Sequence, residues 1–235
     1  MNEFQPISCF RNAVPRRDIP AWFTGWHRQY PHATHALHDA VAEGFGEVIP
    51  MLICGEQSAI AVFENEIQEL GVAGITDIRA KFASIACDEQ AHEIAWQRLF
   101  SELPRPADFE QTKRRATVFF ARLGRVQSSA EHFAQIAHLD SAVGVIMWHL
   151  ERSALARSEA VKTLTTNIKK DEARHANLSR RYALSLGLSK SRFAEMGDHI
   201  RGELVRLLAH KGDALEAIGI DPTRLFQRIH SSYAR

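Results

Sequence analysis

Two short segments with the pattern Asp-Glu-x-x-His constrain how this chain can fold. One covers residues 88–92 and the other covers residues 171–175, which begin 83 positions later (171 − 88). On an α-helix, residues three positions apart lie on one face, so each segment can direct a carboxylate and an imidazole toward one point. The Asp before each Glu lies about 100° further round the helix and therefore faces a neighbouring helix. If the two segments pack face to face, they can chelate two metal ions.

The hydrophobic pattern of the chain is helical throughout. No segment alternates apolar and polar residues over the length of a strand, so we predict an all-α fold. The first helical pattern covers about residues 32–70; Pro50 is expected to break or kink it, and the Gly-rich stretch 71–74 to end it. Further helices are predicted over about residues 77–101, 108–125, 130–149, 158–186 and 190–210.

A length of 235 residues predicts one domain with a sizeable core. Within it we predict an irregular N-terminal arm over residues 1–31, because this stretch is rich in Pro and aromatic residues and has no period. A four-helix core with the metal site is expected over residues 50–185, followed by a C-terminal helical extension over residues 190–235.

Charge and cysteine content narrow the class of protein. Lys plus Arg number 29 and Asp plus Glu number 28, which predicts neither nucleic acid nor an anionic membrane as a partner. Cys9, Cys54 and Cys87 include no Cys-x-x-Cys pair, so no disulfide framework or zinc ribbon is expected. Cys54 and Cys87 lie in apolar helical stretches and should behave as small buried hydrophobes. No signal peptide and no apolar stretch of membrane-spanning length is visible, and we expect a cytoplasmic protein.

A di-metal site in a four-helix bundle needs one more carboxylate from each of the other two helices. If the first hairpin turns near residue 73, the acid level with Glu89 is Glu56, 33 positions earlier (89 − 56). In the second hairpin, Asp140 precedes Glu172 by 32 positions (172 − 140). Glu151 is the alternative, although it would lie about 16 Å of helix nearer the turn. Asp140 is preferred and Glu151 stays open.

Four carboxylates and two imidazoles therefore form the predicted ligand set. Their four negative charges would neutralise two divalent cations, and a majority of hard oxygen donors favours iron or manganese. Without metal, the clustered acids would repel one another or take up protons. The alternative is that these residues form ordinary surface pairs. The predicted ligands are Glu56, Glu89, His92, Asp140, Glu172 and His175.

The residues beside the ligands also have expected roles. A metal-bound histidine normally donates its other ring N–H to a carboxylate. We expect Asp88 to orient His175 from the opposite hairpin, Asp171 to orient His92, and Arg174 to pair with one of these aspartates.

Positions one helical turn from the ligands are mostly small or apolar. This composition suits a dry chamber around the metal site, and it suits ordinary core packing equally well. The predicted pocket residues are Ala59, Ile60, Phe63, Trp96, Val143, Gly144 and Met147.

Residues 171–175, Asp-Glu-Ala-Arg-His, resemble the Asp-Glu-x-Arg-His motif of the ferritin-like di-iron carboxylate superfamily, in its oxygen-activating branch. The resemblance covers about residues 50–185 and is specific for metal site and fold, not for substrate. It implies a ferritin-like four-helix bundle with additional N- and C-terminal helices. It also implies two iron ions, with manganese or a mixed pair as alternatives. The first motif departs from the pattern because it lacks the Arg, and Asp140 replaces the usual Glu of the second half.

The function that this resemblance implies is O2 activation. The expected protein is a non-haem di-iron oxygenase or oxidase that oxidises a small organic substrate, with an external electron donor and a homodimeric state. Two alternatives remain open: a ferroxidase or other iron-handling protein, and a peroxide-detoxifying protein of rubrerythrin-like or manganese catalase-like type.

Overall fold

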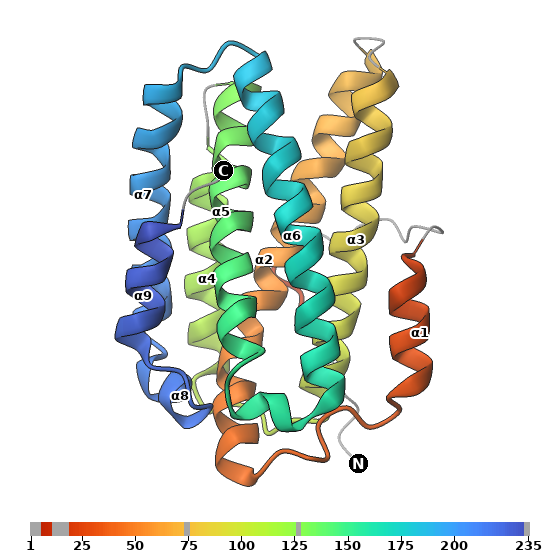
Figure 1. Ribbon diagram of the computed structural model, residues 1–235, viewed down its shortest axis with the longest axis vertical. Helices are drawn as coiled ribbons and strands as arrows, with labels where there is room; N and C mark the ends of the chain where they lie inside the picture. The colour runs from red at the N-terminus through yellow and green to blue at the C-terminus, as the bar shows by residue number, and fades with distance from the viewer. Residues whose placement is uncertain (1–5, 11–18, 73–75, 126–127, 233–235) are drawn as a thin grey trace.

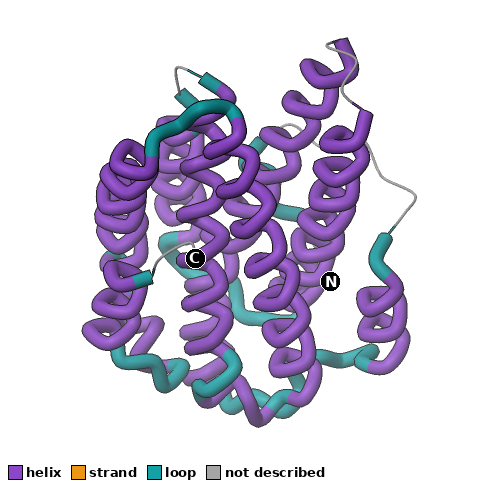
Figure 2. The backbone as a smooth tube through the Cα atoms, turned by 45° about the horizontal axis from the view of Figure 1, so that its top comes forward, coloured by secondary structure: helices purple, strands orange, loops and turns teal. Residues whose placement is uncertain are grey.

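The computed structural model describes residues 6–10, 19–72, 76–125 and 128–232. Within these ranges the chain forms helices joined by short loops and contains no strand (Figure 2). The predicted all-α class is therefore confirmed, and the arrangement is a ferritin-like bundle.

Four long helices form the core of the bundle. The first hairpin pairs α2 (Asp39–Val72) with α3 (Thr76–Ser101), and the second pairs α5 (Ser129–Leu150) with α6 (Glu159–Ser185) (Figure 1). Between the hairpins, α4 (Phe109–Leu123) returns the chain along α2, so that α5 begins at the end of the bundle opposite the start of α2. The predicted turn at 71–74 lies partly outside the described residues.

A serine hydroxyl caps the N-terminus of each helix of the second hairpin. The side chain of Ser128 accepts a hydrogen bond from the backbone N–H of Glu131, and that of Ser158 accepts one from Val161. Each cap satisfies a backbone donor that the first turn of a helix leaves without a partner. In the hairpin that follows, donor atoms of Asp140 on α5 and Glu172 on α6 lie within 4.8 Å of each other.

Pro50 was expected to break or kink the first long helix, and it does not break it. It lies inside α2, which is 34 residues long. Proline removes one backbone hydrogen bond and costs about 3 kcal/mol in a helix interior. Here the residues on both sides, including Ile49 and Ile53, are fully buried, and this packing keeps the segment helical.

The N-terminal arm is not irregular throughout, and the prediction was wrong for its second half. Residues Ala21–Gln29 form α1, which packs against α6 and α3. Phe23 and Trp26 are buried, and Nε1 of Trp26 donates to the carbonyl of Ala160 at 2.8 Å. Aromatic residues at helical spacing thus dock the segment. Residues 1–5 and 11–18 of the predicted arm lie outside the described residues.

C-terminal helices cover one side of the bundle. They are α7 (Lys190–Ala209), α8 (Gly212–Ala217) and α9 (Pro222–Ser231), and a 3-10 helix, η1 (Ala154–Arg157), joins α5 to α6. α7 packs on α4 and α5, and α9 packs on α5 and α7 (Figure 1). The face of α5 that points away from α6 is therefore also covered.

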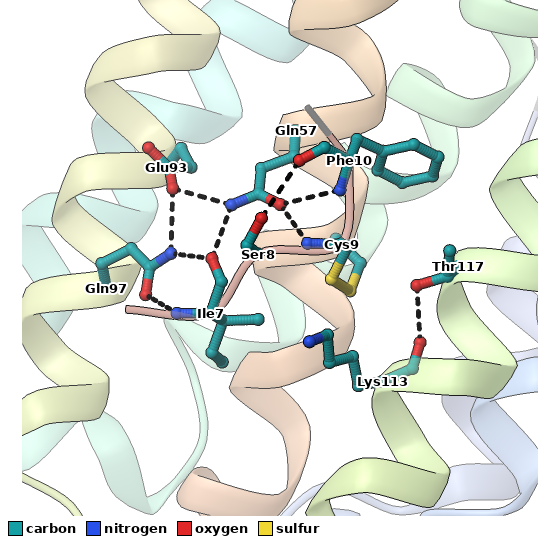
Figure 3. Close-up of a disulfide and its surroundings, with 10 residues drawn as sticks. Ile7, Ser8, Cys9, Phe10, Gln57, Glu93, Gln97, Lys113 and Thr117 are labelled. Carbon is teal, nitrogen blue, oxygen red and sulfur yellow. Dashed lines mark hydrogen bonds between the residues drawn. A yellow bond between two sulfur atoms is a disulfide. The ribbon is translucent and has the colours of Figure 1, made fainter. Parts of the chain in front are cut away.

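Cys9 and Cys54 form a disulfide, which corrects the expectation that Cys54 is a free buried thiol. The bond attaches the segment around Cys9 to α2 (Figure 3). Gln57 strengthens the attachment, because its side chain accepts from the backbone N–H of Cys9 at 2.8 Å and donates to the carbonyl of Ile7 at 2.8 Å. Cys87 is half-buried and is not part of a disulfide.

Part of α2 has the length and hydropathy of a membrane span. The segment Asp39–Gln68 contains an 18-residue window of mean hydropathy 1.3, of which 61% is buried inside the bundle. A core helix of a globular protein has the same properties, so this segment is weak evidence for a membrane.

Candidate di-metal centre

The four core helices direct four carboxylates and two imidazoles into the middle of the bundle. α2 and α5 contribute one acid each, whereas α3 and α6 each contribute the Glu and His of the repeated motif. All six side chains are buried, and the two histidines have no exposed surface. The structure brings together every predicted ligand: Glu56, Glu89, His92, Asp140, Glu172 and His175.

The donor atoms form two adjoining groups. In the first, one donor atom each from Glu56, Glu89, His92 and Glu172 lies within 4.8 Å of the others. In the second, Asp140, Glu172 and His175 meet the same limit. Glu172 belongs to both groups. Glu89 also reaches the second, since its Oε1 lies 2.9 Å from Nδ1 of His175. Glu89 and Glu172 are therefore placed to contribute to both groups.

Several of these donor atoms have no hydrogen-bond partner. They include Nδ1 of both histidines, Oε1 of Glu89 and Oδ2 of Asp140. Nδ1 of His175 and Oε1 of Glu89 are close to each other but are not in hydrogen-bonding geometry. Leaving a buried polar atom without a partner costs about 1–3 kcal/mol. Several such atoms around one point fit a pair of cations, so the residues present suit the group that the ligand chemistry implies.

Each histidine is held from behind by an aspartate of the opposite hairpin. Nε2 of His92 lies 3.3 Å from Oδ2 of Asp171, and Nε2 of His175 lies 3.2 Å from Oδ2 of Asp88. A proton on Nε2 satisfies each aspartate and leaves Nδ1 with a lone pair that points into the site. These contacts therefore favour the tautomer whose Nε2 carries a proton, and they orient each ring so that Nδ1 points into the site.

Arg174 and Trp22 fix the two aspartates. Arg174 donates to Asp88 and, at 3.2 Å, to Asp171, so one half-exposed guanidinium spans both. Nε1 of Trp22 donates to Oδ2 of Asp171 at 3.2 Å. This role of Trp22 could not be predicted from the sequence, because the contact joins residues 149 positions apart.

Trp96 binds a ligand residue. Its Nε1 donates to Oε1 of Glu56 at 3.0 Å, and the ring is fully buried. The sequence contains a signal for this role: Trp96 lies one turn after His92 on α3, and a buried indole N–H normally needs an acceptor.

The electrostatics describe a site that holds protons when it holds no metal. Burial is the main reason that the pKa of Glu56 rises to about 8, and it also raises the pKa values of Asp140 and Glu172 well above the usual range. Burial opposes the charge of His175 as well, yet Glu89 and Asp88 raise its pKa to about 9. Cations would replace these protons.

The alternative acid Glu151 lies outside the site. It caps the end of α5, where its carboxylate accepts from Thr166 at 2.7 Å and pairs with Lys169. The Lys169 hydrogen bond is the main reason that its pKa falls to about 2. The structure thus places Asp140, and not Glu151, with the other donors.

A cavity of about 100 Å³ lies against the carboxylates, between α2, α4, α5 and α7. Ala59 and Val143 line it as expected. Four other predicted pocket residues lie in the core away from this cavity: Ile60, Phe63, Trp96 and Met147. On a helix, a position one turn from a ligand can face either the cavity or the opposite hairpin, and the pattern does not distinguish these sides.

Gly144 lines a second, more polar cleft on another side of Asp140. This cleft lies between α5, α6 and α9 and has a volume of about 540 Å³. Lys169, Asn177 and Arg228 are among its lining residues. A Cβ atom at Gly144 would have no heavy atom within 4 Å, so the residue leaves open space beside Asp140.

Comparison with known proteins adds one match. A family model described as Rubrerythrin matches residues 47–183, which is 137 of the 235 residues (183 − 47 + 1). The matched segment contains all six donor residues. Searches of curated proteins and of solved structures return no match.

Proposed function

The chain belongs to the rubrerythrin family, and from this membership we propose that it is a di-iron enzyme that reduces peroxides with electrons from an external donor. The observation that carries the proposal is the set of buried donor atoms without partners, which includes Nδ1 of both His92 and His175. Family membership favours peroxide reduction over the O2-dependent oxidation that the Asp-Glu-x-Arg-His motif predicts.

Two iron ions are the proposed cofactor, with manganese as the alternative. Glu89 and Glu172 would help to hold both ions, because each reaches both donor groups. Glu56 would complete one side and Asp140 the other. Ferrous ions held there would supply the two electrons that reduce a peroxide (H2O2 + 2 Fe(II) + 2 H⁺ → 2 H2O + 2 Fe(III)).

The residues of the chain prepare this chemistry. Asp88 and Asp171 accept from Nε2 of the histidines and so direct each Nδ1 inward. Arg174 offsets part of the negative charge of the aspartates. Burial keeps bulk water away from the carboxylates, which strengthens their attraction for the cations.

The second candidate function is the O2-dependent oxidation of a small organic substrate. The apolar cavity beside Glu56 and Asp140 favours it, because O2 or H2O2 alone would need no such space. Iron handling is the third possibility, in which Fe(II) is itself the substrate.

An anaerobic experiment separates the three. Protein loaded with about two Fe(II) per chain is mixed with H2O2 or with O2, and Fe(II) oxidation is followed by absorbance. The proposal expects rapid loss of about one peroxide for every two ferrous ions, and a slower reaction with O2. A fast reaction with O2 alone would favour the oxidase, and oxidation of many added Fe(II) per chain would favour iron handling.

Matched variants test whether the site is responsible. Glu89→Ala and Glu172→Ala should abolish the rapid reaction with peroxide. Glu151→Ala removes a carboxylate of the same second hairpin that lies outside the site, and it should leave the rate within about twofold. Equal rates in all three variants would contradict the proposal.

A further inference from the structure

The cavity beside the carboxylates is elongated along the bundle. On α2 its lining extends from Met51 to Val62, about 16 Å of helix, and on α5 from His132 to Ile146, about 21 Å. The two helices run in opposite directions, so Met51 and Ile146 lie toward the same end (Figure 1). Glu56 lies between the ends of this lining.

The cavity meets the site only from the carboxylate side. All four acids of the site line its wall, whereas neither His92 nor His175 does. A molecule in the cavity would therefore approach the site from the side of the carboxylates, opposite the two imidazoles.

Aliphatic side chains form most of the remaining wall. Three leucines of α7, which lies outside the four core helices, are part of this wall: Leu204, Leu207 and Leu208. Space lined by aliphatic side chains takes up apolar ligands: an apolar cavity of about 150 Å³ binds benzene. By the same ratio, about 100 Å³ accommodates an alkyl group of about four carbons.

Hydrogen peroxide has no group that would fill this space. We propose that the cavity binds the alkyl group of a short-chain alkyl hydroperoxide, an inference that rests on the peroxide reduction proposed above. The hydroperoxide group would then lie against the carboxylate wall while the alkyl group contacts Leu204 and its neighbours.

The step is balanced by the two ferrous ions and two protons from solvent (ROOH + 2 Fe(II) + 2 H⁺ → ROH + H2O + 2 Fe(III)). The O–O bond breaks, one oxygen leaves as water, and the other stays on the alkyl group as an alcohol. Each ferrous ion loses one electron, and the external electron donor returns both ions to the ferrous state.

The first test measures binding in the metal-free protein, so that it does not depend on activity. tert-Butanol, the unreactive analogue of tert-butyl hydroperoxide, is titrated while the methyl NMR signals of Ile136, Val143 and Ile146 are followed. These residues line the cavity, and their signals should shift and saturate. In Leu204→Trp the indole fills the space, and the saturating shifts should disappear.

Val118→Trp is the matched control. Val118 lies on α4, away from the cavity, and its side chain is 43% exposed. This variant adds the same indole and should bind tert-butanol like the unmodified protein. If Leu204→Trp loses its helical circular dichroism, Ala59→Phe, which fills the cavity from α2, replaces it. Unchanged saturating shifts in the folded filling variant, or none in the unmodified protein, would overturn the proposal.

The second test compares tert-butyl hydroperoxide with H2O2 on the ferrous protein. Filling the cavity should slow oxidation by tert-butyl hydroperoxide by about tenfold or more, the loss expected when two methyl-sized groups can no longer be buried. Oxidation by H2O2 should stay within about twofold. If filling the cavity slows both reactions equally, or slows neither of them, the assignment of the cavity is overturned and the proposed function is not affected. Failure of both peroxides to oxidise the unmodified protein would instead overturn the proposed function.

Discussion

Nε2 of His175 lies 3.2 Å from Oδ2 of Asp88, although 87 positions of sequence separate the two residues. The reciprocal contact joins His92 to Asp171 across 79 positions at 3.3 Å. Each motif therefore supplies both a histidine and the aspartate that orients the other histidine. The two hairpins are joined at the level of the site by this exchange.

The exchange predicts that the aspartates control metal affinity. Asp88→Asn replaces the acceptor of His175 by an amide and should lower the affinity for Fe(II) or Co(II) by about 10–100-fold with the helical content unchanged. Competition with a chelating dye measures the affinity. Asp198→Asn, which changes an exposed aspartate of α7, is the control. Equal affinities in the two variants would show that Asp88 does not orient the ligand.

The metal-free protein should lose stability as the pH rises. Folding raises the pKa of Glu56 from 4.5 to about 8, mainly through burial, and that of His175 from 6.5 to about 9, through Glu89 and Asp88 and against burial. The folded state then holds protons that the unfolded chain has released, so its stability falls between pH 6.5 and 9.

Thermal unfolding measured from pH 6.5 to pH 9 checks this expectation. The midpoint should fall with pH in the metal-free protein and change much less in the loaded protein, because cations take the place of the protons. A midpoint that rises over this interval without metal would contradict the protonation that we describe for Glu56 and His175.

The disulfide predicts a dependence of stability on redox state. Cys9 and Cys54 close a loop with a sequence separation of 45, for which chain entropy gives a stabilisation of about 4 kcal/mol. Cys9→Ser should lower the free energy of unfolding by up to this amount under non-reducing conditions. Mass analysis after alkylation under denaturing conditions should find one alkylated cysteine, Cys87, in the unreduced protein. Three free thiols would show that the bond does not form.

Gly46 should not tolerate a side chain. A Cβ atom there would lie 2.5 Å from the carbonyl oxygen of Pro104, where the loop after α3 crosses α2. Gly46→Ala should destabilise the protein by about 1–3 kcal/mol in denaturant unfolding. Gly212→Ala has no heavy atom within 4 Å of the new Cβ and should be neutral or slightly stabilising. Similar losses in both variants would argue against this close contact.

Much of the fold could be predicted because its determinants are local. Helical periodicity, the caps Ser128 and Ser158 and the spacing of the acids each act over a few turns of helix. Hairpin geometry converts the separation of Glu56 from Glu89 into proximity, and it does the same for Asp140 and Glu172. The convergence of the six donors follows from these distances, while their binding of metal stays a prediction.

The remaining features depend on contacts that leave no periodic signal. The pairing of Cys9 with Cys54 depends on how the N-terminal segment lies across α2. The hydrogen bond from Trp22 to Asp171 depends on where α1 docks. Part of the cavity wall comes from leucines of α7, whose position relative to the core no repeat in the sequence reveals.

Metal analysis of protein purified without chelator tests the central claim most directly. We expect about two iron or manganese ions per chain, because four carboxylates neutralise two divalent cations and the two imidazoles complete their coordination. Glu89→Ala and Glu172→Ala should each lose most of the metal and retain their helical circular dichroism. A metal content near zero in the unmodified protein after anaerobic reconstitution, or unchanged content in both variants, would contradict a di-metal centre at this site.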